Sequence, residues 1–282
     1  MIYWFCLPID YSREGTWKKH LRKSCVYQCG GVCQVMKKFI VLWVIAATAL
    51  LVNTAAQAIT ANDILKKVKA AEVSFRDFRA ELVVEEANKK SVAGMGEGYD
   101  EILRLEKAVV CYKKPDKIRY DGYARGIKVT YIQNGYTKLI IAPMVKQKVN
   151  VKDEPGKRQD TLDLGFLSSR LWTDNHVSVV SVGRDGIVKL KFVPKFGPRD
   201  KRHDLVWLDS RTLRMIRHER YRGNGELRLR AVYLEHAKLG STLPIATKSE
   251  LFDGKGRSLG TASYRNLEVN IGLSDSLFSL AQ

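Results

Sequence analysis

Short runs in which apolar and polar residues alternate occupy most of the chain after residue 75, and they restrict its fold more than any other feature. In Leu227–Tyr233, apolar residues largely alternate with arginine, and Val188–Phe192 and Val145–Lys152 repeat this period of two. Such alternation is typical of strands that bury one face. Turn-forming pairs such as Asn134-Gly135 and Asn224-Gly225 separate the runs. We therefore expect a mainly β fold with an antiparallel sheet that is strongly curved or closed as a barrel.

Further strands follow from the same criteria of apolar content and flanking turn residues. They are expected at Arg79–Glu86, Ile102–Tyr112, Lys117–Tyr123, Val129–Gln133, Thr137–Ile141, Val177–Val182, Asp204–Leu208, Met215–Tyr221, Ile245–Phe252 and Ala262–Glu268. The chain shows no long linker and no internal repeat, so these strands are expected to form one domain.

Two segments have helical instead of alternating periodicity. Thr60 and Asp63 resemble a capping box, and the apolar residues after them share one helical face, which predicts a helix over Asn62–Val73. In Asp160–Trp172, three leucines recur at helical spacing and predict a short helix in the middle of the chain.

A secretory signal peptide is expected at Met36–Ala58. Two lysines follow Met36, an uncharged apolar run of about fourteen residues comes next, and a small-x-small cleavage site ends at Ala58. The apolar run is shorter than the roughly twenty residues of a membrane-spanning helix. We therefore expect cleavage after about Ala58, export to the periplasm and a soluble mature domain at residues 59–282.

The segment before the signal peptide, Met1–Val35, contains four of the five cysteines. The spacing of Cys25, Cys29 and Cys33 lacks a fourth ligand and does not match known metal sites. A start codon assigned too early, with Met36 as the true initiator, explains this segment. Cys111 then remains alone, which excludes an intrachain disulfide, and its apolar strand indicates a buried and unreactive thiol.

The chain is strongly basic, with 48 Lys and Arg residues against 30 Asp and Glu residues and a net charge of +18. Seven of these basic residues and two of the acidic ones precede Ile59, which leaves +13 for the mature part. Many of the basic residues alternate with apolar ones and should lie on the outer face of the sheet. The densest group consists of Arg211, Arg214, Arg217, Arg220, Arg222, Arg228 and Arg230. A solvated exterior and an attraction to an anionic membrane surface both fit this charge, whereas export makes nucleic acid an improbable partner.

No motif for catalysis or for a cofactor is present in the sequence. The nucleophile elbow, the HExxH metal motif and the glycine-rich phosphate loops are all absent. The histidines of the mature part are scattered without metal-ligand spacing. We therefore expect neither enzymatic activity nor a metal or other cofactor.

The order of several short motifs resembles the outer-membrane lipoprotein-sorting family, also called LolA-like. An exported chain opens with an amphipathic helix and a strand at Ser74–Ala80, and continues with Tyr112–Tyr120, which contains Lys-Pro-Asp-Lys, and with Ile132–Leu139. Later matches are Leu190–Lys195, Val206–Asp209, Arg222–Glu226 and, at the end, Asn270–Phe278. The resemblance extends over essentially Ile59–Leu280.

The resemblance implies an incomplete antiparallel β-barrel whose helices plug the concave side as a lid. Carriers of this family hold the acyl chains of lipoproteins in a hydrophobic cavity, receive them from an inner-membrane transporter and pass them to an outer-membrane acceptor. The arginine that holds the lid closed in such carriers is replaced here by Lys114, which lacks the planar fork of arginine. The residues expected to line the cavity are Leu103, Leu105, Ile118, Tyr120, Leu139, Ile141, Leu164, Leu167, Leu190, Phe192, Leu227 and Leu229.

From these observations we expect a monomeric periplasmic carrier that binds the acyl chains of lipoproteins or phospholipids. Two alternatives stay open at this point. The same fold could serve as a lipid-binding sensor of envelope stress, and the apolar interior could be a filled core without a cavity.

Overall fold

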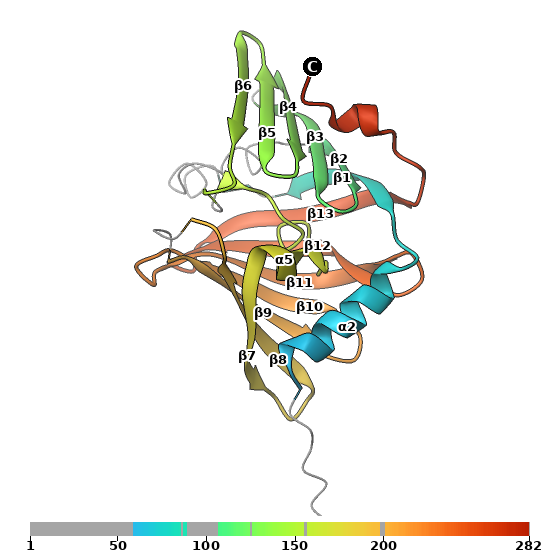
Figure 1. Ribbon diagram of the computed structural model, residues 1–282. Helices are drawn as coiled ribbons and strands as arrows, with labels where there is room; N and C mark the ends of the chain where they lie inside the picture. The colour runs from blue at the N-terminus through green and yellow to red at the C-terminus, as the bar shows by residue number, and fades with distance from the viewer. Residues whose placement is uncertain are drawn as a thin grey trace, which may run out of the picture. The chain divides into compact units, whose positions relative to one another are not determined.

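Thirteen antiparallel strands form a single sheet in the described part of the computed structural model, in the order β6-β5-β4-β3-β2-β1-β13-β12-β11-β10-β9-β8-β7 (Figure 1). The structure describes residues 59–85, 87–88, 107–124, 126–154, 157–197 and 201–281. These residues belong to one compact unit, Ala58–Gln282. The expected signal peptide at Met36–Ala58 and the segment Met1–Val35 lie outside the described residues.

Each predicted strand corresponds to a strand of the structure, with described ends that differ by up to six residues, while Glu86 and Ile102–Glu106 of the predicted strands lie outside the described residues. The strands are β1 (Asp77–Glu85), β2 (Lys107–Lys113), β3 (Lys117–Ala124), β4 (Ile127–Asn134), β5 (Thr137–Ala142), β6 (Val145–Asn150), β7 (Asn175–Val182), β8 (Ile187–Pro194), β9 (His203–Asp209), β10 (Met215–Tyr221), β11 (Leu227–Leu239), β12 (Leu243–Asp253) and β13 (Ser258–Val269). The helical elements are α2 (Ala61–Glu72), α5 (Arg170–Asp174) and the 3-10 turn η2 (Asp275–Phe278).

The sheet is strongly curved and open, so it is an incomplete barrel. Its two edges are β6, which pairs with β5, and β7, which pairs with β8. Closure into a full barrel, which the alternation of residues also allowed, does not occur. The two lysines of β6 are exposed to solvent, a feature that protects an edge strand from further pairing.

The N-terminal helix is confirmed almost to the residue. Thr60 caps α2 by a reciprocal capping box, in which its Oγ1 accepts from the Asp63 amide and the Asp63 carboxylate accepts from the Thr60 amide. Ile64, Val68 and Ala71 are buried on the predicted face, while the lysines between them are exposed. The helix lies across the sheet and contacts β7 and β12.

The predicted helix over Asp160–Trp172 is wrong for most of its length, because only Arg170–Asp174 is helical. Asp160 accepts a hydrogen bond from the Leu162 amide at 2.8 Å and so starts a turn. Gly165 then takes a φ of +84°, which ends any right-handed helix. The three leucines that suggested a helix are all buried, but only Leu171 lies in a helix, so the spacing of Leu164 and Leu167 reflects burial of an irregular loop. We call residues 157–169 the plug loop.

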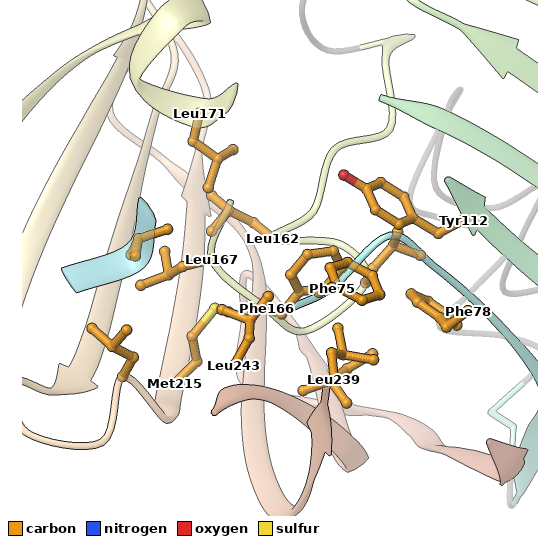
Figure 2. Close-up of a cluster of buried hydrophobic side chains, with 14 of the residues drawn as sticks. Phe75, Phe78, Tyr112, Leu162, Phe166, Leu167, Leu171, Met215, Leu239 and Leu243 are labelled. Carbon is orange, nitrogen blue, oxygen red and sulfur yellow. The ribbon is translucent and has the colours of Figure 1, made fainter. Parts of the chain in front are cut away.

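The main hydrophobic core lies between the sheet and the plug loop with α2. Phe166 of the plug loop packs edge-to-face against Phe75, Phe78 and Tyr112, with ring centroids 5.3–6.2 Å apart (Figure 2). A second, smaller cluster lies under the C-terminal segment, where Phe278 of η2 covers Ile132 and Leu139. The sheet therefore buries apolar residues on both of its faces around β4 and β5.

Candidate ligand-binding pocket

The plug loop is held on the sheet by backbone and side-chain contacts. The Ala246 amide of β12 donates to the Gly165 carbonyl oxygen at 2.9 Å, and the Tyr233 hydroxyl of β11 donates to the Leu162 carbonyl oxygen at 3.1 Å. Within the loop, the hydroxyl groups of Thr161 and Ser168 are 2.9 Å apart and hydrogen-bonded. These contacts fix the loop as one wall of a pocket.

The pocket lies between the plug loop and strands β1, β3 and β10–β13. Its volume is about 770 Å³, a value that includes space open to solvent. Its cavity volume without that open space is about 90 Å³, which is smaller than the roughly 300–1,000 Å³ that is common for ligand pockets. The apolar part of its lining consists of Leu82, Val84, Leu162, Leu164, Leu229, Ala231, Ala246, Leu251 and Ala262.

The polar part of the lining consists of Asp163, His218 and three tyrosines, Tyr120, Tyr233 and Tyr264, together with Gln159, Thr247, Ser249 and Ser263. Asp163 and His218 belong to a network of buried charges with Asp204 of β9 and Arg220 of β10. The Arg220 guanidinium is 2.7 Å from Asp204 and 3.2 Å from Asp163. We call Asp160, Asp163, Asp204, His218 and Arg220 the polar end of the pocket.

Burial raises the pKa of Asp163 well above its ordinary value, and the neighbouring Asp160 carboxylate adds to this effect. The pKa of Asp160 is raised to about 6 by burial and by Asp204. Burial opposes the charged form of His218, but the hydrogen bond between its Nε2 and Asp204 at 3.0 Å, with the nearby carboxylates, raises its pKa overall. Asp160, Asp163 and His218 therefore retain protons at higher pH than the same groups in an unfolded chain, whereas burial lowers the pKa of Arg220 to about 9.

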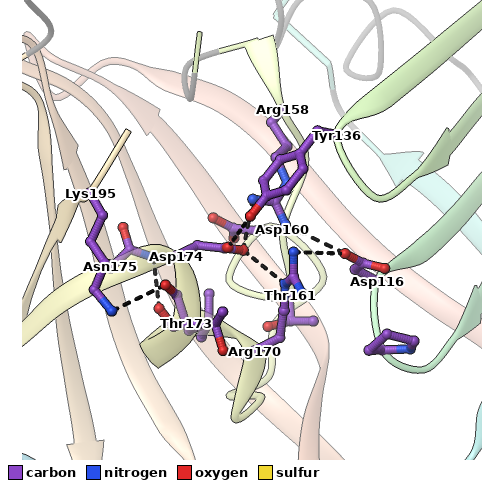
Figure 3. A network of polar contacts seen from close by, with 12 residues as sticks. Asp116, Tyr136, Arg158, Asp160, Thr161, Arg170, Thr173, Asp174, Asn175 and Lys195 are labelled. Carbon is purple, nitrogen blue, oxygen red and sulfur yellow. Dashed lines mark hydrogen bonds and ion pairs between the residues drawn. The ribbon is translucent and has the colours of Figure 1, made fainter. Parts of the chain in front are cut away.

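A second set of contacts joins the plug loop and α5 to turns of the sheet (Figure 3). Arg158 and Arg170 both pair with Asp174, at 2.7 and 3.1 Å, and the Tyr136 hydroxyl donates to the same carboxylate at 2.7 Å. Arg170 also pairs at 3.2 Å with Asp116, which lies in the turn between β2 and β3. The pKa of Asp174 is lowered because these cations and hydrogen bonds outweigh the effect of its burial.

The end of α2 is connected to both the sheet and the plug loop. The Lys114 ammonium donates to the carbonyl oxygen of Glu72 at 2.9 Å, and the Glu72 carboxylate accepts from the Ser169 amide at 3.0 Å. A cation at a helix C-terminus also interacts favourably with the helix dipole. Lys114, the position that the family resemblance singled out, thus contacts the last turn of α2.

The structure brings only some of the predicted cavity residues together. Tyr120, Leu164 and Leu229 line the pocket. Ile118, Leu167, Leu190 and Phe192 are buried in the main core beside it, and Leu227 is half-buried outside both clusters. Leu139 and Ile141 belong to the second cluster on the opposite face of the sheet. Leu103 and Leu105 lie outside the described residues.

The sequence interpretation missed the polar end of the pocket. Arg220 was expected on the outer face with the other arginines, but its side chain is 6% exposed and pairs with buried carboxylates. A signal was present, since Asp204 has the same alternation as the core residues Val206 and Leu208. Across the ladder, His218 pairs with Val206 and Arg220 with Asp204, so all three polar residues point inward. Cys111 is buried as predicted, and burial raises the pKa of its thiol.

Neither a metal site nor a membrane-spanning helix is found in the described residues. No group of three or more His, Cys, Asp or Glu side chains in them is placed to hold a metal ion. In the same residues, no helix is long and apolar enough to cross a membrane.

Comparison with known proteins gives matches in structure only. No protein-family model matches the chain, and no curated protein matches its sequence. A LolA-superfamily protein from Nitrosomonas europaea superposes with a TM-score of 0.55 at 16% identity and covers 79% of this chain and 98% of its own. A domain from Vibrio parahaemolyticus, described as belonging to an outer-membrane lipoprotein-sorting protein, superposes with a TM-score of 0.54 at 12% identity and covers 77% of this chain and 95% of its own. The chain therefore has a LolA-like fold, as the order of its motifs predicted.

Proposed function

We propose that this protein is a periplasmic carrier that shelters the acyl chains of lipoproteins or lipids in the pocket beneath the plug loop, without catalysis. The pocket itself is the observation that supports this proposal most, because it joins a largely apolar lining to a fold shared with lipoprotein-sorting domains. In this proposal, residues Met36–Ala58 direct export and are removed.

The energetics of an acyl chain explain why such a carrier needs an enclosed pocket. Each CH₂ group that leaves water contributes about 0.8 kcal/mol, so exposing a chain of sixteen carbons costs roughly 12 kcal/mol. The leucine, valine and alanine side chains of the pocket replace water around the chain. Entry requires displacement of the plug loop or of α2, since both cover the concave side of the sheet.

In the proposed carrier, Lys114 would control how easily α2 and the plug loop are displaced. Its hydrogen bond to Glu72, together with the bond from Ser169, connects α2, the plug loop and the turn after β2. Breaking this connection would remove one of the contacts that hold α2 and the plug loop together. A membrane transporter that delivers cargo and an acceptor that removes it are the partners that this cycle needs, and the basic exterior favours contact with an anionic membrane surface.

The test is to purify the protein from the periplasm and to record native mass spectra. Bound lipid or acylated peptide is the expected result, together with saturable uptake of a fluorescent fatty acid ester by delipidated protein. Ser249 lines the pocket, so S249F should fill the pocket and abolish uptake. Ser178 is an exposed residue of β7, so the control variant S178F should leave uptake unchanged. Empty protein that takes up no acylated probe would refute the carrier proposal.

A further inference from the structure

Three β-bulges bring exposed aliphatic side chains to the surface of the sheet. The strand ladders skip Val180 of β7, Ile216 of β10 and Leu234 of β11, and these three residues are 50%, 38% and 48% exposed. A bulge turns a side chain out of the regular pattern of its strand. Exposed aliphatic residues indicate an interaction site where they belong to one contiguous patch.

The three bulges flank a single row of residues on the outer face of the sheet, the face away from the main core. The row crosses β7–β11 by direct pairing of Ser181, Lys189, Trp207, Arg217 and Val232. Val180 and Ile216 each precede a member of this row, and Leu234 lies two residues after Val232. Trp207 alternates with the fully buried Val206 and Leu208, so the row points away from the core. We call this row, with the three bulge residues, the outer patch.

Two cations lie against the tryptophan at the centre of the outer patch. The Lys189 ammonium is 4.7 Å and the Arg217 guanidinium 4.3 Å from the centre of the Trp207 ring. The face of an aromatic ring attracts cations. Positive charge and apolar surface are therefore held together in one patch.

The adjacent row of the outer face adds to this positive charge. In that row, Lys191 and Glu219 both pair with Leu205 of β9. The Glu219 carboxylate is 2% exposed and pairs with Arg217 and, at 2.8 Å, with Arg230. With the two lysines of β8, the two rows thus hold four cations and one carboxylate. The surplus of positive charge matches an anionic partner.

We propose that the outer patch docks the protein on an anionic phospholipid bilayer, with its three bulge side chains among the acyl chains and Trp207 at the level of the headgroups. Tryptophan is enriched at membrane–water interfaces, and lysine and arginine are attracted to anionic lipids. Lysine is depleted at protein–protein interfaces, so the two lysines of β8 favour a lipid surface over an acidic protein. This inference deepens the membrane contact of the proposed function but does not depend on what the pocket binds.

The experiment is co-sedimentation of the protein purified from the periplasm with vesicles of phosphatidylcholine, alone or mixed with phosphatidylglycerol. Binding is expected to the mixed, anionic vesicles. K189Q/K191Q should weaken it about 25-fold, since each cation near an anionic surface contributes about fivefold. K146Q/K148Q is the matched control, because it removes the same charge from exposed positions of β6 at the other edge of the sheet, and it should retain binding.

Two outcomes of this experiment would overturn the inference. Equal weakening in K189Q/K191Q and K146Q/K148Q would show that the basic exterior as a whole attracts the vesicles, without a docking site. Absence of binding to either kind of vesicle would exclude a lipid surface and favour an acidic protein partner. Neither outcome changes the expected uptake of acyl chains by the pocket, so the carrier proposal is tested separately.

Trp207 reports its own insertion, because Trp172 is the only other tryptophan after residue 58. In W172F, the emission of Trp207 should shift to shorter wavelength when anionic vesicles bind. Phosphatidylcholine with brominated acyl chains should quench this emission. Binding of the vesicles without a shift or quenching would overturn the placement of the outer patch against the membrane.

The bulge residues are tested by replacing their apolar side chains with polar ones. I216S/L234S should lose affinity for the anionic vesicles, because less apolar surface enters the bilayer. M144S/V145S is the matched control, since both of these apolar residues are exposed at the turn before β6, outside the outer patch, and it should bind like the unmodified protein. Unchanged affinity of I216S/L234S, or an equal loss in M144S/V145S, would refute insertion of the bulge residues.

Discussion

Gly165 connects the plug loop to the sheet, and its replacement by alanine tests whether this loop forms a fixed wall of the pocket. Its φ of +84° lies in the left-handed region, where a side chain costs about 1–2 kcal/mol. An added Cβ would lie 2.9 Å from the Cβ and 3.3 Å from the carbonyl oxygen of Ala246, atoms of a central strand that move little. Relief of such overpacking costs about 1–3 kcal/mol. We therefore expect G165A to lower the free energy of unfolding by about 2–5 kcal/mol.

Gly225 offers a matched control, because its φ is +85° but an added Cβ would meet no atom within 4 Å. G225A should therefore lose only the conformational part, about 1–2 kcal/mol. Equilibrium unfolding in urea measures both variants, and an unchanged slope with denaturant shows that the midpoints report stability. Equal losses in G165A and G225A would refute the close contact between the plug loop and β12, and with it the description of this loop as a fixed wall.

Three further predictions concern charged groups around the pocket. The pKa values of Asp160, Asp163 and His218 are raised, and these three groups outnumber the two histidines with lowered pKa values, His203 and His236, so the folded protein should bind more protons than the unfolded chain. The urea midpoint should therefore fall as pH rises from about 5 to 8, and a midpoint that rises instead would contradict this balance. D174A should destabilise the fold by about 3 kcal/mol, because Arg158 and Arg170 lose their shared carboxylate. In the native protein, the stabilisation by these two ion pairs should be lost as pH falls through the lowered pKa of Asp174. K114M should speed amide hydrogen exchange in the last turn of α2, because the hydrogen bond from Lys114 to the Glu72 carbonyl oxygen is lost. K114R should restore the protection, and unaltered exchange in K114M would show that Lys114 does not hold the helix.

The contacts of the plug loop explain how an irregular segment can serve where a helix was expected. A helix satisfies its own backbone groups, whereas this loop uses Tyr233, Ala246 and its own side chains for that purpose. Its leucines can therefore face both the core and the pocket without helical geometry. Displacement of this wall, which the proposed carrier needs for loading and release, breaks these hydrogen bonds and also exposes Phe166 and the buried leucines.

Local patterns were sufficient to predict most elements of the fold. The capping box at Thr60 and the single apolar face of α2 are properties of adjacent residues, and they hold in the structure. The alternation in β8 likewise records the burial of Val188, Leu190 and Phe192. These predictions succeeded because caps and strand faces depend on residues a few positions apart.

The placement of these faces could not be predicted in the same way. Leu139 and Leu190 are both apolar residues of predicted strands, yet Leu139 packs under η2 and Leu190 lies in the main core. Period-two alternation identifies residues that share a face but does not say what covers it. The chain segments that cover the two faces come from distant parts of the sequence, and only the tertiary structure brings them into contact.

The sequence by itself determined the strands, the capped helix α2 and the order of motifs from which the LolA-like fold was predicted. The resemblance to the LolA-like family also predicted the incomplete barrel, whereas the tertiary structure alone decided that Leu164 and Leu167 lie on a loop and that Arg220 is buried among carboxylates. The physical reason is that an arginine between apolar residues can point toward solvent or inward. The inward position is stable only where distant residues, here Asp163 and Asp204, supply the opposite charge.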